Sequence, residues 1–487
     1  FPAPTWPFDR LTHLTTTRAT NMELQNASQT KSLLAILAAG VSAWFAWRKW
    51  KSLQHLPPGK LFMWPLLGES VRYVADPLKF VEEKLTEHGG TFRSNVLLGN
   101  TVFLAVTDSN AKLFYSRKDL GWPLHFQKLV GLKALPMVND PLHKKLRTLN
   151  GRAFGDRQLD SYLSKLSKLS AKYLDLWVDN ADSKDLHMEV KKYAFECGEA
   201  VILGVENDQL KTDRFMQLYD KAFRGLGYVL PFDLPGFPFR QCMNARRQLV
   251  EDFKDVIQQK RKKLQDPCRM FKINTMLDTM LQTEDNSSDE ELLDFCVGMM
   301  FAAHDTTLCS IQSCLHWLKC VPTVEERLRR EVHSVWDGEE PITRKILESL
   351  PQLKAFLQEV WRMTPPVVVI SRRVTEDIEV DGYIVPKGWK LNFAPAGKHS
   401  KCEEPETFSI ERHLDQGKFL DRLFDSTYFN SFGGGSRMCI GYKFARDEML
   451  VFFLHFLRGY DLKLDQSDHR KFPFNFWRLK GAFQRLA

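Results

Sequence analysis

The sequence predicts a mainly α-helical protein with a small β-sheet side, preceded by one N-terminal membrane-anchor helix. Three observations support this fold class. An uncharged run occupies residues 32–47, helical periodicity dominates from about Asp160 to Thr364, and strand-like segments follow between residues 367 and 385. With 487 residues, of which 44% are hydrophobic, the chain can bury a large core and is too apolar to be disordered.

The expected anchor reads SLLAILAAGVSAWFAW, which is 16 residues without a charge, and Arg48, Lys49 and Lys51 follow it. A membrane span needs about 20 apolar residues, so this run is short but workable with flanking Trp, Lys and Arg. A signal peptide and a buried core helix are weaker interpretations, because no small-residue cleavage site follows and the run lies near the terminus. We divide the chain into an extension of uncertain status (1–31), the anchor with its basic flank (32–55) and the main domain (56–487).

Charge and cysteine usage narrow the functional classes. The net charge is +8, but Lys and Arg are spread along the chain and no zinc-finger or RNA-binding signature occurs, so nucleic-acid binding is not predicted. A basic face for an anionic membrane or an acidic protein partner stays open beside an ordinary solvated surface. No cysteine pair has zinc-site spacing, which together with their odd number indicates reduced thiols in a cytosol-facing domain. The nine cysteines are Cys197, Cys242, Cys268, Cys296, Cys309, Cys314, Cys320, Cys402 and Cys439.

The main domain begins with the rigid break LPPG at residues 56–59, and helices and strands follow in order. Helices are expected at 159–177, at 246–264 and over the long apolar pattern 288–320, where Ser288 and Glu291 have capping-box spacing. Strands are expected at 367–374, 378–380 and 383–385, with a hairpin turn at Asp381-Gly382. A last helix is expected from about Tyr442 to Arg458.

A glycine-rich loop holds one cysteine just before that last helix. Residues 432–441 read FGGGSRMCIG, and consecutive glycines allow positive φ and a close approach to a flat object. A thiolate before a helix N-terminus is stabilised by the dipole and by backbone N–H groups, as an anionic iron ligand requires. The segment resembles the haem-binding signature of the cytochrome P450 superfamily at its five fixed positions, Phe432, Gly435, Arg437, Cys439 and Gly441. The resemblance implies a cytochrome P450 fold, haem b as cofactor and Cys439 as the axial iron ligand.

The long apolar helix contains the stretch FAAHDTT at residues 301–307. Burying Asp305 and Thr306 in such a run is costly without a purpose, and Thr306 can bond back to a carbonyl one turn earlier or open a kink that admits water. The stretch is similar to the family's oxygen-activation motif. That similarity implies that Asp305 and Thr306 guide protons during catalysis and that Ala302 leaves room over the haem. His304 is expected to pack within the helix rather than to bind a ligand.

Further charged residues match family positions. Glu359 and Arg362 share a helix face and resemble the structural Glu-x-x-Arg motif, for which Arg412 is the expected third member. His143 and Arg147 match the helical position that, in the family, neutralises the haem carboxylates, as Arg437 would do from the cysteine loop. The resemblance places a further cation at Arg372 or Arg373, and the spacing to Asp377 favours Arg372.

The resemblance covers nearly the whole chain, and stretches such as WPLLGES and GWPLHFQKLVG are similar to one branch of the family. That branch oxidises retinoic acid, sterols, triterpenoids and diterpenoid-type plant hormones. It implies a lipophilic isoprenoid-derived substrate, a hydroxylation with O2, and electrons from NADPH through NADPH-cytochrome P450 reductase. It also implies anchoring in the endoplasmic reticulum membrane, with a plastid membrane as the alternative. Expected substrate contacts are Phe126, Leu129, Phe301, Val367, Val368 and residues near Phe474.

Two other functional classes stay open at this point. A haem-thiolate hydroperoxide isomerase or dehydratase would need no oxygen, but such members often lack the Thr of the acid–alcohol pair. A non-catalytic haem- or sterol-binding protein would need no electron partner. The sequence alone names neither the substrate nor the position oxidised, and it leaves the organelle and the oligomeric state undetermined.

Overall fold

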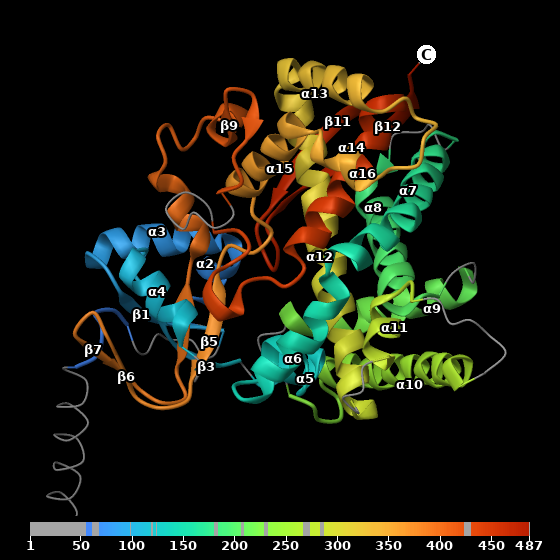
Figure 1. Cartoon of the computed structure of the whole chain (residues 1–487). Coiled ribbons are helices and arrows are strands. Elements are labelled where there is room, and N and C mark those ends of the chain that lie inside the picture. Colours follow the sequence, from blue (N-terminus) through green and yellow to red (C-terminus); the bar gives the residue numbers. More distant parts are fainter. Residues whose placement is uncertain are drawn as a thin grey trace, which may run out of the picture. The chain divides into compact units, whose positions relative to one another are not determined.

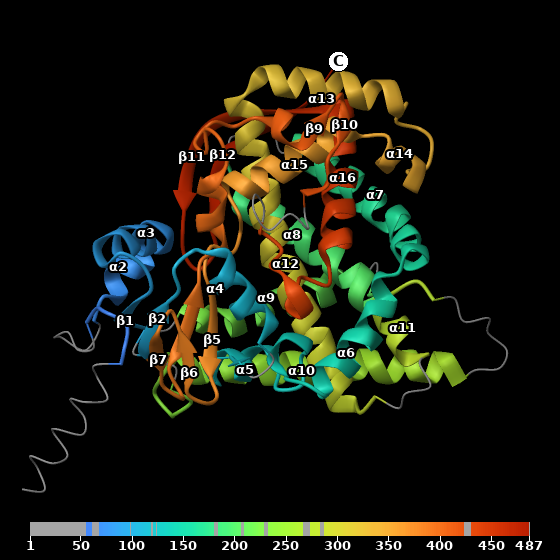
Figure 2. The same cartoon turned by 60° about the vertical axis from the view of Figure 1, so that its left-hand side comes forward.

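The computed structural model describes residues 55–60, 68–97, 99–117, 120–122, 124–179, 184–205, 209–227, 232–265, 273–282, 287–422 and 430–486. The chain divides into a first unit of residues 1–56 and 382–384 and a second unit of residues 57–381 and 385–487. The expected anchor helix, the N-terminal extension and Cys268 lie outside the described residues. The second unit covers most of the range 56–487 that the sequence analysis assigns to the main domain, and Figures 1 and 2 show its helices and strands.

Helices dominate the second unit, as the sequence predicts. The first group carries α2 (Ser70–Ala75), α3 (Pro77–His88), α4 (Asp108–Ser116), α5 (Leu124–Val130), α6 (Leu142–Gly151), α7 (Asp156–Asp179) and α8 (Leu186–Gly198). The second group carries α9 (Gln209–Phe223), α10 (Pro238–Gln265), α11 (Met276–Leu281), α12 (Asp289–Cys320), α13 (Pro322–Val335), α14 (Arg344–Glu348), α15 (Pro351–Met363) and α16 (Tyr442–Gly459). The expected helices at 159–177, 246–264, 288–320 and 442–458 correspond to α7, α10, α12 and α16.

The largest sheet has five strands in the order β1-β2-β8-β5-β3, and it lies with α2, α3 and α4 at the left of Figure 1. Its strands are β1 (Phe92–Val96), β2 (Gly99–Phe103), β3 (Leu120–Gly121), β5 (Ile370–Val374) and β8 (Lys390–Phe393). The expected strand 367–374 is shorter than predicted, because its partner β8 ends where Phe393 pairs with Ile370. The carbonyl of Pro366 instead accepts a hydrogen bond from the Asn475 N–H at 3.0 Å.

The remaining strands form small sheets. β6 (Ile378–Val380) and β7 (Tyr383–Val385) match the expected strands, and both turn residues, Asp381 and Gly382, have positive φ. The sequence did not predict the long hairpin of β11 (Tyr460–Arg470) and β12 (Phe476–Arg485), to which β4 (Lys184–Asp185) pairs. It was not predicted because many of its side chains are polar or exposed, so the sequence lacks the regular alternation of apolar residues that indicates a strand. β9 (Leu414–Asp415) and β10 (Lys418–Phe419) form the last pair.

Helix α12 is the central element of the core. Its start is fixed by a reciprocal cap, in which the Glu291 N–H donates to Ser288 Oγ at 3.2 Å and the Ser288 N–H donates to Glu291 Oε2 at 2.9 Å. The helix packs against α8, α10, α15 and α16. It is the one helix of the described part that has the length and hydropathy of a membrane span, yet 67% of its most apolar window is buried inside the protein. We therefore interpret α12 as a core helix.

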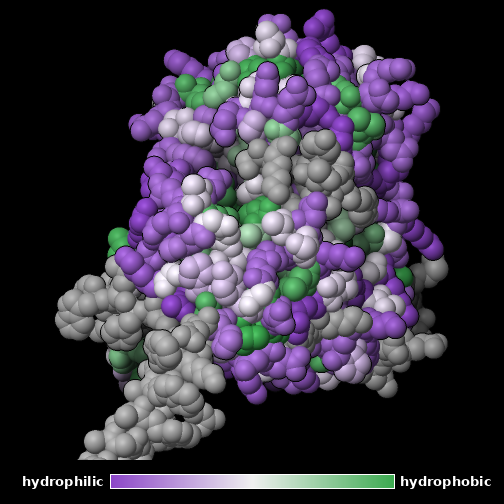
Figure 3. Space-filling model, turned by 90° about the vertical axis from the view of Figure 1, so that its left-hand side faces the viewer, coloured by the Kyte–Doolittle hydropathy of each residue, from purple (hydrophilic) through white to green (hydrophobic). Residues whose placement is uncertain are grey.

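Hydrophobic side chains are distributed unevenly over the outside of the protein. Figure 3 shows one face on which hydrophilic residues dominate and hydrophobic residues gather in small separate patches. Large apolar residues with substantial exposure include Val71, Leu132, Leu210, Phe232 and Leu234. Single exposed apolar residues are ordinary on soluble surfaces, so they do not by themselves indicate a contact with a membrane.

Candidate functional site

The cysteine loop is a tight turn that directly precedes α16. The Cys439 N–H donates to the Phe432 carbonyl at 2.9 Å, and the Met438 N–H donates to the Gly435 carbonyl at 3.2 Å. Gly433 and Gly435 have φ values of 73° and 61°, a region that L side chains rarely adopt. The Cys439 side chain is exposed at the end of this turn, three residues before the first residue of α16.

Tyr115 of α4 explains part of the glycine requirement. A Cβ atom on Gly434 would lie 3.1 Å from the Tyr115 ring, and one on Gly435 would lie 2.9 Å from the Tyr115 carbonyl oxygen. The sequence led us to expect a close approach to a flat ligand. In the structure the described group that these two glycines approach is Tyr115, so the turn is held against α4. Sequence analysis missed Tyr115, because no local pattern links it to a loop more than 300 residues later.

Basic side chains gather around the loop. Arg147 Nη1 donates to the Met438 carbonyl at 2.8 Å, and Arg437 donates to the Val138 carbonyl at 2.7 Å and to Asn139 Oδ1 at 2.9 Å. His143 Nδ1 lies 3.5 Å from Asp140 Oδ1. The four predicted residues Cys439, Arg437, His143 and Arg147 therefore do lie together, although they come from two distant segments.

Burial and mutual repulsion shift the pKa values of the cysteine and of the basic residues around it. Although Cys439 is exposed at the surface of the turn, the protein atoms packed around it exclude water from part of the thiol and raise its pKa, whereas the Gly441 N–H and Arg147 act in the opposite direction. Burial, and after it the charges of Arg437 and Arg147, lower the pKa of His143 to about 4 against the opposing effect of Asp140. Burial and then the charge of Arg437 lower the pKa of Arg372 to about 9. Guanidinium groups that disfavour one another are suited to a ligand that carries more than one carboxylate.

The structure distinguishes between the two candidate arginines of β5. Arg372 is half-buried, and its guanidinium carbon lies 4.0 Å from the centre of the Trp122 ring. Arg373, the next residue, is exposed. Arg372 is therefore the member of the pair that belongs to the basic cluster. Trp122 lies within the stretch GWPLHFQKLVG, but its contact with Arg372 was not predicted from the sequence.

A chain of aromatic contacts connects the basic cluster to α12. Trp122 stacks on Phe126 with ring centres 4.8 Å apart, and Phe126 meets Phe301 edge to face at 5.5 Å. Phe301 lies one residue before Ala302, which is exposed although most of its helix is buried. α12 also packs against α16, the helix that follows Cys439. The two groups of predicted site residues therefore belong to one connected region.

The two predicted proton-transfer residues have different partners. Thr306 Oγ1 donates to the Ala302 carbonyl at 2.6 Å, which is the first of the two geometries expected from the sequence. Asp305 Oδ2 accepts a hydrogen bond from the Tyr219 hydroxyl of α9 at 3.0 Å. His304 is fully buried and packs between Phe195 and Tyr219, in agreement with the expected packing role. The contribution of Tyr219 was not predicted from the sequence.

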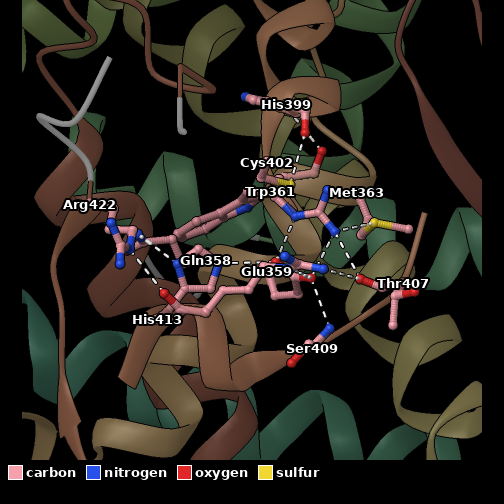
Figure 4. Close-up of polar contacts among 12 residues, drawn as sticks. Gln358, Glu359, Trp361, Met363, His399, Cys402, Thr407, Ser409, His413 and Arg422 are labelled. Atoms are coloured by element: carbon pink, nitrogen blue, oxygen red, sulfur yellow. Dashed lines mark hydrogen bonds and ion pairs between the residues drawn. The ribbon is translucent and has the colours of Figure 1, made fainter. Parts of the chain in front are cut away.

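The Glu-x-x-Arg pair, Glu359 and Arg362, is the centre of a buried polar network. Two hydrogen bonds of 2.8 Å join Arg362 to the Glu359 carboxylate, and both residues are buried. Figure 4 shows Glu359 between His413 and Ser409, whose Nε2 and backbone N–H lie 3.0 Å and 2.9 Å from the carboxylate. Arg412, the expected third member, lies 3.4 Å from Glu359. His413, which was not predicted, is a further partner of the same carboxylate. Hydrogen bonds outweigh the effect of burial and hold the pKa of Glu359 at about 2.

This buried network reaches the cysteine loop through backbone contacts. His399 Nδ1 donates to the Arg362 carbonyl at 3.0 Å, and its Nε2 accepts from the Asn430 N–H at 3.1 Å. The Ser431 hydroxyl donates to the Trp361 carbonyl at 2.7 Å, and the Trp361 ring meets Phe432 edge to face at 5.0 Å. The residues that open the loop are thus fixed by α15.

Comparisons with known proteins agree with this geometry. A family model described as Cytochrome P450 matches residues 57–484. Taxane 10-beta-hydroxylase from Taxus cuspidata is 29% identical over 475 residues, covering 93% of each chain. Abscisic acid 8'-hydroxylase 2 from Arabidopsis thaliana is 27% identical, covering 84% of this chain and 85% of that protein. The structure of a retinoic acid-bound cyanobacterial CYP120A1 has the same fold, with a TM-score of 0.75 at 24% identity, and covers 88% of this chain and 99% of its own.

Replacing Glu359 with Ala should destabilise the protein by about 3–5 kcal/mol, because the change leaves Arg362 buried without its carboxylate. The pKa of Glu359 lies below its ordinary value of 4.5, so its contribution to stability is complete above that pH and is lost as the pH falls towards 2. Thermal melts from pH 7 to pH 2 measure both effects. Glu251→Ala is the control, since Glu251 forms an exposed pair with Lys254 at the same spacing. Equal melting temperatures for Glu359→Ala and the wild type would contradict the assignment.

Proposed function

This chain belongs to the cytochrome P450 family, and on that premise we propose that it hydroxylates a bulky, hydrophobic molecule of isoprenoid origin. The family and its hydroxylase relatives make the chain a cytochrome P450 mono-oxygenase acting on a hydrophobic substrate. The finer proposal rests on one observation. Two relatives that match most of their own length are hydroxylases of a taxane and of abscisic acid, both of which are terpenoid compounds.

Family membership implies haem, and the residues of the described site are suited to it. We propose that Cys439 would hold the haem iron through its thiolate and that Phe432, Gly435 and Gly441 shape the loop around the thiol. The haem supplies the oxygen-activating chemistry that no protein side chain provides. The crowded guanidinium groups support a ligand with two carboxylates, which would relieve their repulsion. Arg437, Arg372, Arg147 and His143 are the residues proposed to hold those carboxylates.

We further propose that Asp305 and Thr306 hold and move the protons that the reaction consumes. Thr306 donates its own hydrogen to the Ala302 carbonyl, which leaves the lone pairs of its hydroxyl oxygen free to accept a hydrogen bond from a proton-carrying group. The exposed methyl of Ala302 leaves room beside this hydroxyl. The carboxylate of Asp305, the preceding residue, can accept a proton and, once protonated, can donate it.

The substrate site is proposed to lie beside the aromatic cluster. Phe301 of α12 contacts both Phe126 of α5 and Phe223 of α9, and these three helices are far apart in the sequence. Val367 is exposed and Val368 is nearly buried, so Val367 is the better candidate for a contact with substrate. An aromatic, apolar lining suits a terpenoid skeleton, which has few groups for polar recognition.

Electrons are proposed to come from NADPH through NADPH-cytochrome P450 reductase. The net charge of +8 is compatible with an acidic flavoprotein partner. Membrane anchoring through residues 32–55 is proposed as well, in the endoplasmic reticulum with a cytosolic catalytic domain or, alternatively, in a plastid membrane. An anchored enzyme would receive a lipophilic substrate directly from the bilayer.

Reaction conditions test the proposed activity. Purified protein with NADPH, the reductase and O2 should convert abscisic acid, β-amyrin or a taxane alcohol to a product with one added oxygen atom, detected by mass spectrometry. Conversion of a lipid hydroperoxide without NADPH or O2 would instead support an isomerase or dehydratase. Binding of these lipids with no NADPH consumption would support a binding protein.

The cysteine assignment predicts a spectrum. The reduced, carbon monoxide-treated protein should show the Soret band of a thiolate-ligated haem, and Cys439→Ala should lose that band. Cys320→Ala is the matched control, because Cys320 is also exposed but lies at the end of α12. A thiolate-type band that survives in Cys439→Ala would exclude this ligand.

The arginine assignment predicts a difference in haem retention. Arg372→Gln should release haem to apomyoglobin at least about tenfold faster than the wild type, since a charge-assisted hydrogen bond contributes about 1.5–3 kcal/mol. Arg373→Gln should retain haem normally, because Arg373 is exposed. Equal release rates for the two variants would remove Arg372 from the proposed set.

A further inference from the structure

Two side chains lie close to the Asp305 carboxylate. The Tyr219 hydroxyl donates to Oδ2 at 3.0 Å, and Nδ1 of His304 lies 3.4 Å from Oδ1. Tyr219 and His304 are almost completely buried, with exposed fractions of 1% and 0%. Burial raises the pKa of Tyr219 well above its ordinary value, and the nearby Asp305 raises it further, so this hydroxyl stays protonated and donates. The position of Asp305 therefore depends on α9 as well as on its own helix.

The protonation state of His304 increases the dependence of Asp305 on Tyr219. Its Nε2 lies 3.2 Å from the Lys191 carbonyl, which can only accept, so Nε2 carries the hydrogen. Burial lowers the pKa of His304, which favours the neutral ring and leaves a lone pair on Nδ1. In that state His304 offers no hydrogen to the carboxylate. The Tyr219 hydroxyl is then the donor that satisfies Asp305 within this cluster.

The same face of α9 contacts the aromatic cluster. Phe223, one helical turn after Tyr219, stacks on Phe301 with ring centres 5.0 Å apart, and Phe301 is one helical turn before Asp305. The rings of Tyr219 and Phe223 are themselves 4.5 Å apart. Two contacts, Phe223 with Phe301 and Tyr219 with Asp305, thus join the same two helices side by side. A displacement of α9 that makes room beside Phe301 must also move the Tyr219 hydroxyl relative to Asp305.

We propose that Tyr219 is a positioning residue that couples the arrival of substrate beside Phe223 and Phe301 to the orientation of Asp305, and hence to proton delivery. The inference rests on the proposed function, in which Asp305 and Thr306 supply protons. An adjacent ion pair of 2.6 Å, between Lys191 of α8 and Asp220 of α9, holds the two helices together beside this cluster. The charged and titratable groups that face His304 and Asp305 are Lys191, Asp220, His187 and Cys309, in addition to Tyr219.

A double-mutant cycle tests the hydrogen bond without using activity. Tyr219→Phe, Asp305→Asn and the double variant are compared with the wild type by thermal unfolding. The expected coupling is about tenfold or more in the unfolding equilibrium constant, as for a hydrogen bond to a charged acceptor. Tyr73→Phe combined with Asp305→Asn is the matched control, because Tyr73 is a buried tyrosine of α2. Additive effects of Tyr219→Phe and Asp305→Asn would overturn the proposal.

Solvent isotope effects test the positioning role. With NADPH and the reductase, Tyr219→Phe should consume NADPH about tenfold more slowly and with a larger H2O/D2O rate ratio, because proton transfer becomes limiting. Phe223→Ala, which opens the space beside Phe301, should change that ratio when Tyr219 is present but not in the Tyr219→Phe background. An unchanged ratio in Tyr219→Phe would leave the hydrogen bond purely structural and would also overturn the proposal. A protein without the thiolate-type carbon monoxide spectrum would instead contradict the proposed function, while the unfolding cycle would still report on the hydrogen bond.

Discussion

The buried carboxylate of Glu359 is the constraint on which the rest of the site depends. A buried charge is costly unless hydrogen bonds surround it, and here Arg362, His413 and the Ser409 N–H supply them together. These donors belong to α15 and to the segment after residue 395, so the carboxylate is satisfied only when both are in place. His399 extends the same arrangement to Asn430, just before the cysteine loop. The position of the thiol is thus tied to a charge elsewhere in the core.

Helix α12 also carries polar side chains in the core that need hydrogen-bond partners. Its middle contains four consecutive polar residues in an apolar core, and each has a separate partner. His304 contacts the Lys191 carbonyl, Asp305 the Tyr219 hydroxyl, Thr306 the Ala302 carbonyl and Thr307 the Glu448 carboxyl group. Burial raises the pKa of Glu448 to about 8, so this last pair requires no buried charge at neutral pH. The polar stretch is accommodated without a break in the helix, and the exposed surface is left at Ala302.

Local patterns predicted those features whose causes are local. The start of α12 could be predicted from the capping residues Ser288 and Glu291, because the two residues of the cap are close together in the sequence. Asp381 and Gly382 gave the turn between β6 and β7 for the same reason. The five fixed positions around Cys439 identified the family that the whole-chain match also supports. The long hairpin β11–β12 was missed because its stability comes from pairing between distant residues and from packing against α12, and its own pattern is largely polar.

The sequence alone therefore determined the helical fold class, the family and the residues that carry its motifs, because each depends on spacing within one short segment. Only the tertiary structure decided which distant groups meet. It brought Tyr219 to Asp305, Trp122 to Arg372, Tyr115 to the glycines of the loop, and His413 to Glu359. The physical reason is that a hydrogen bond or a ring contact is short, whereas its partners are separated along the chain by up to several hundred residues. Such a contact leaves no period or spacing in the sequence from which it could be predicted.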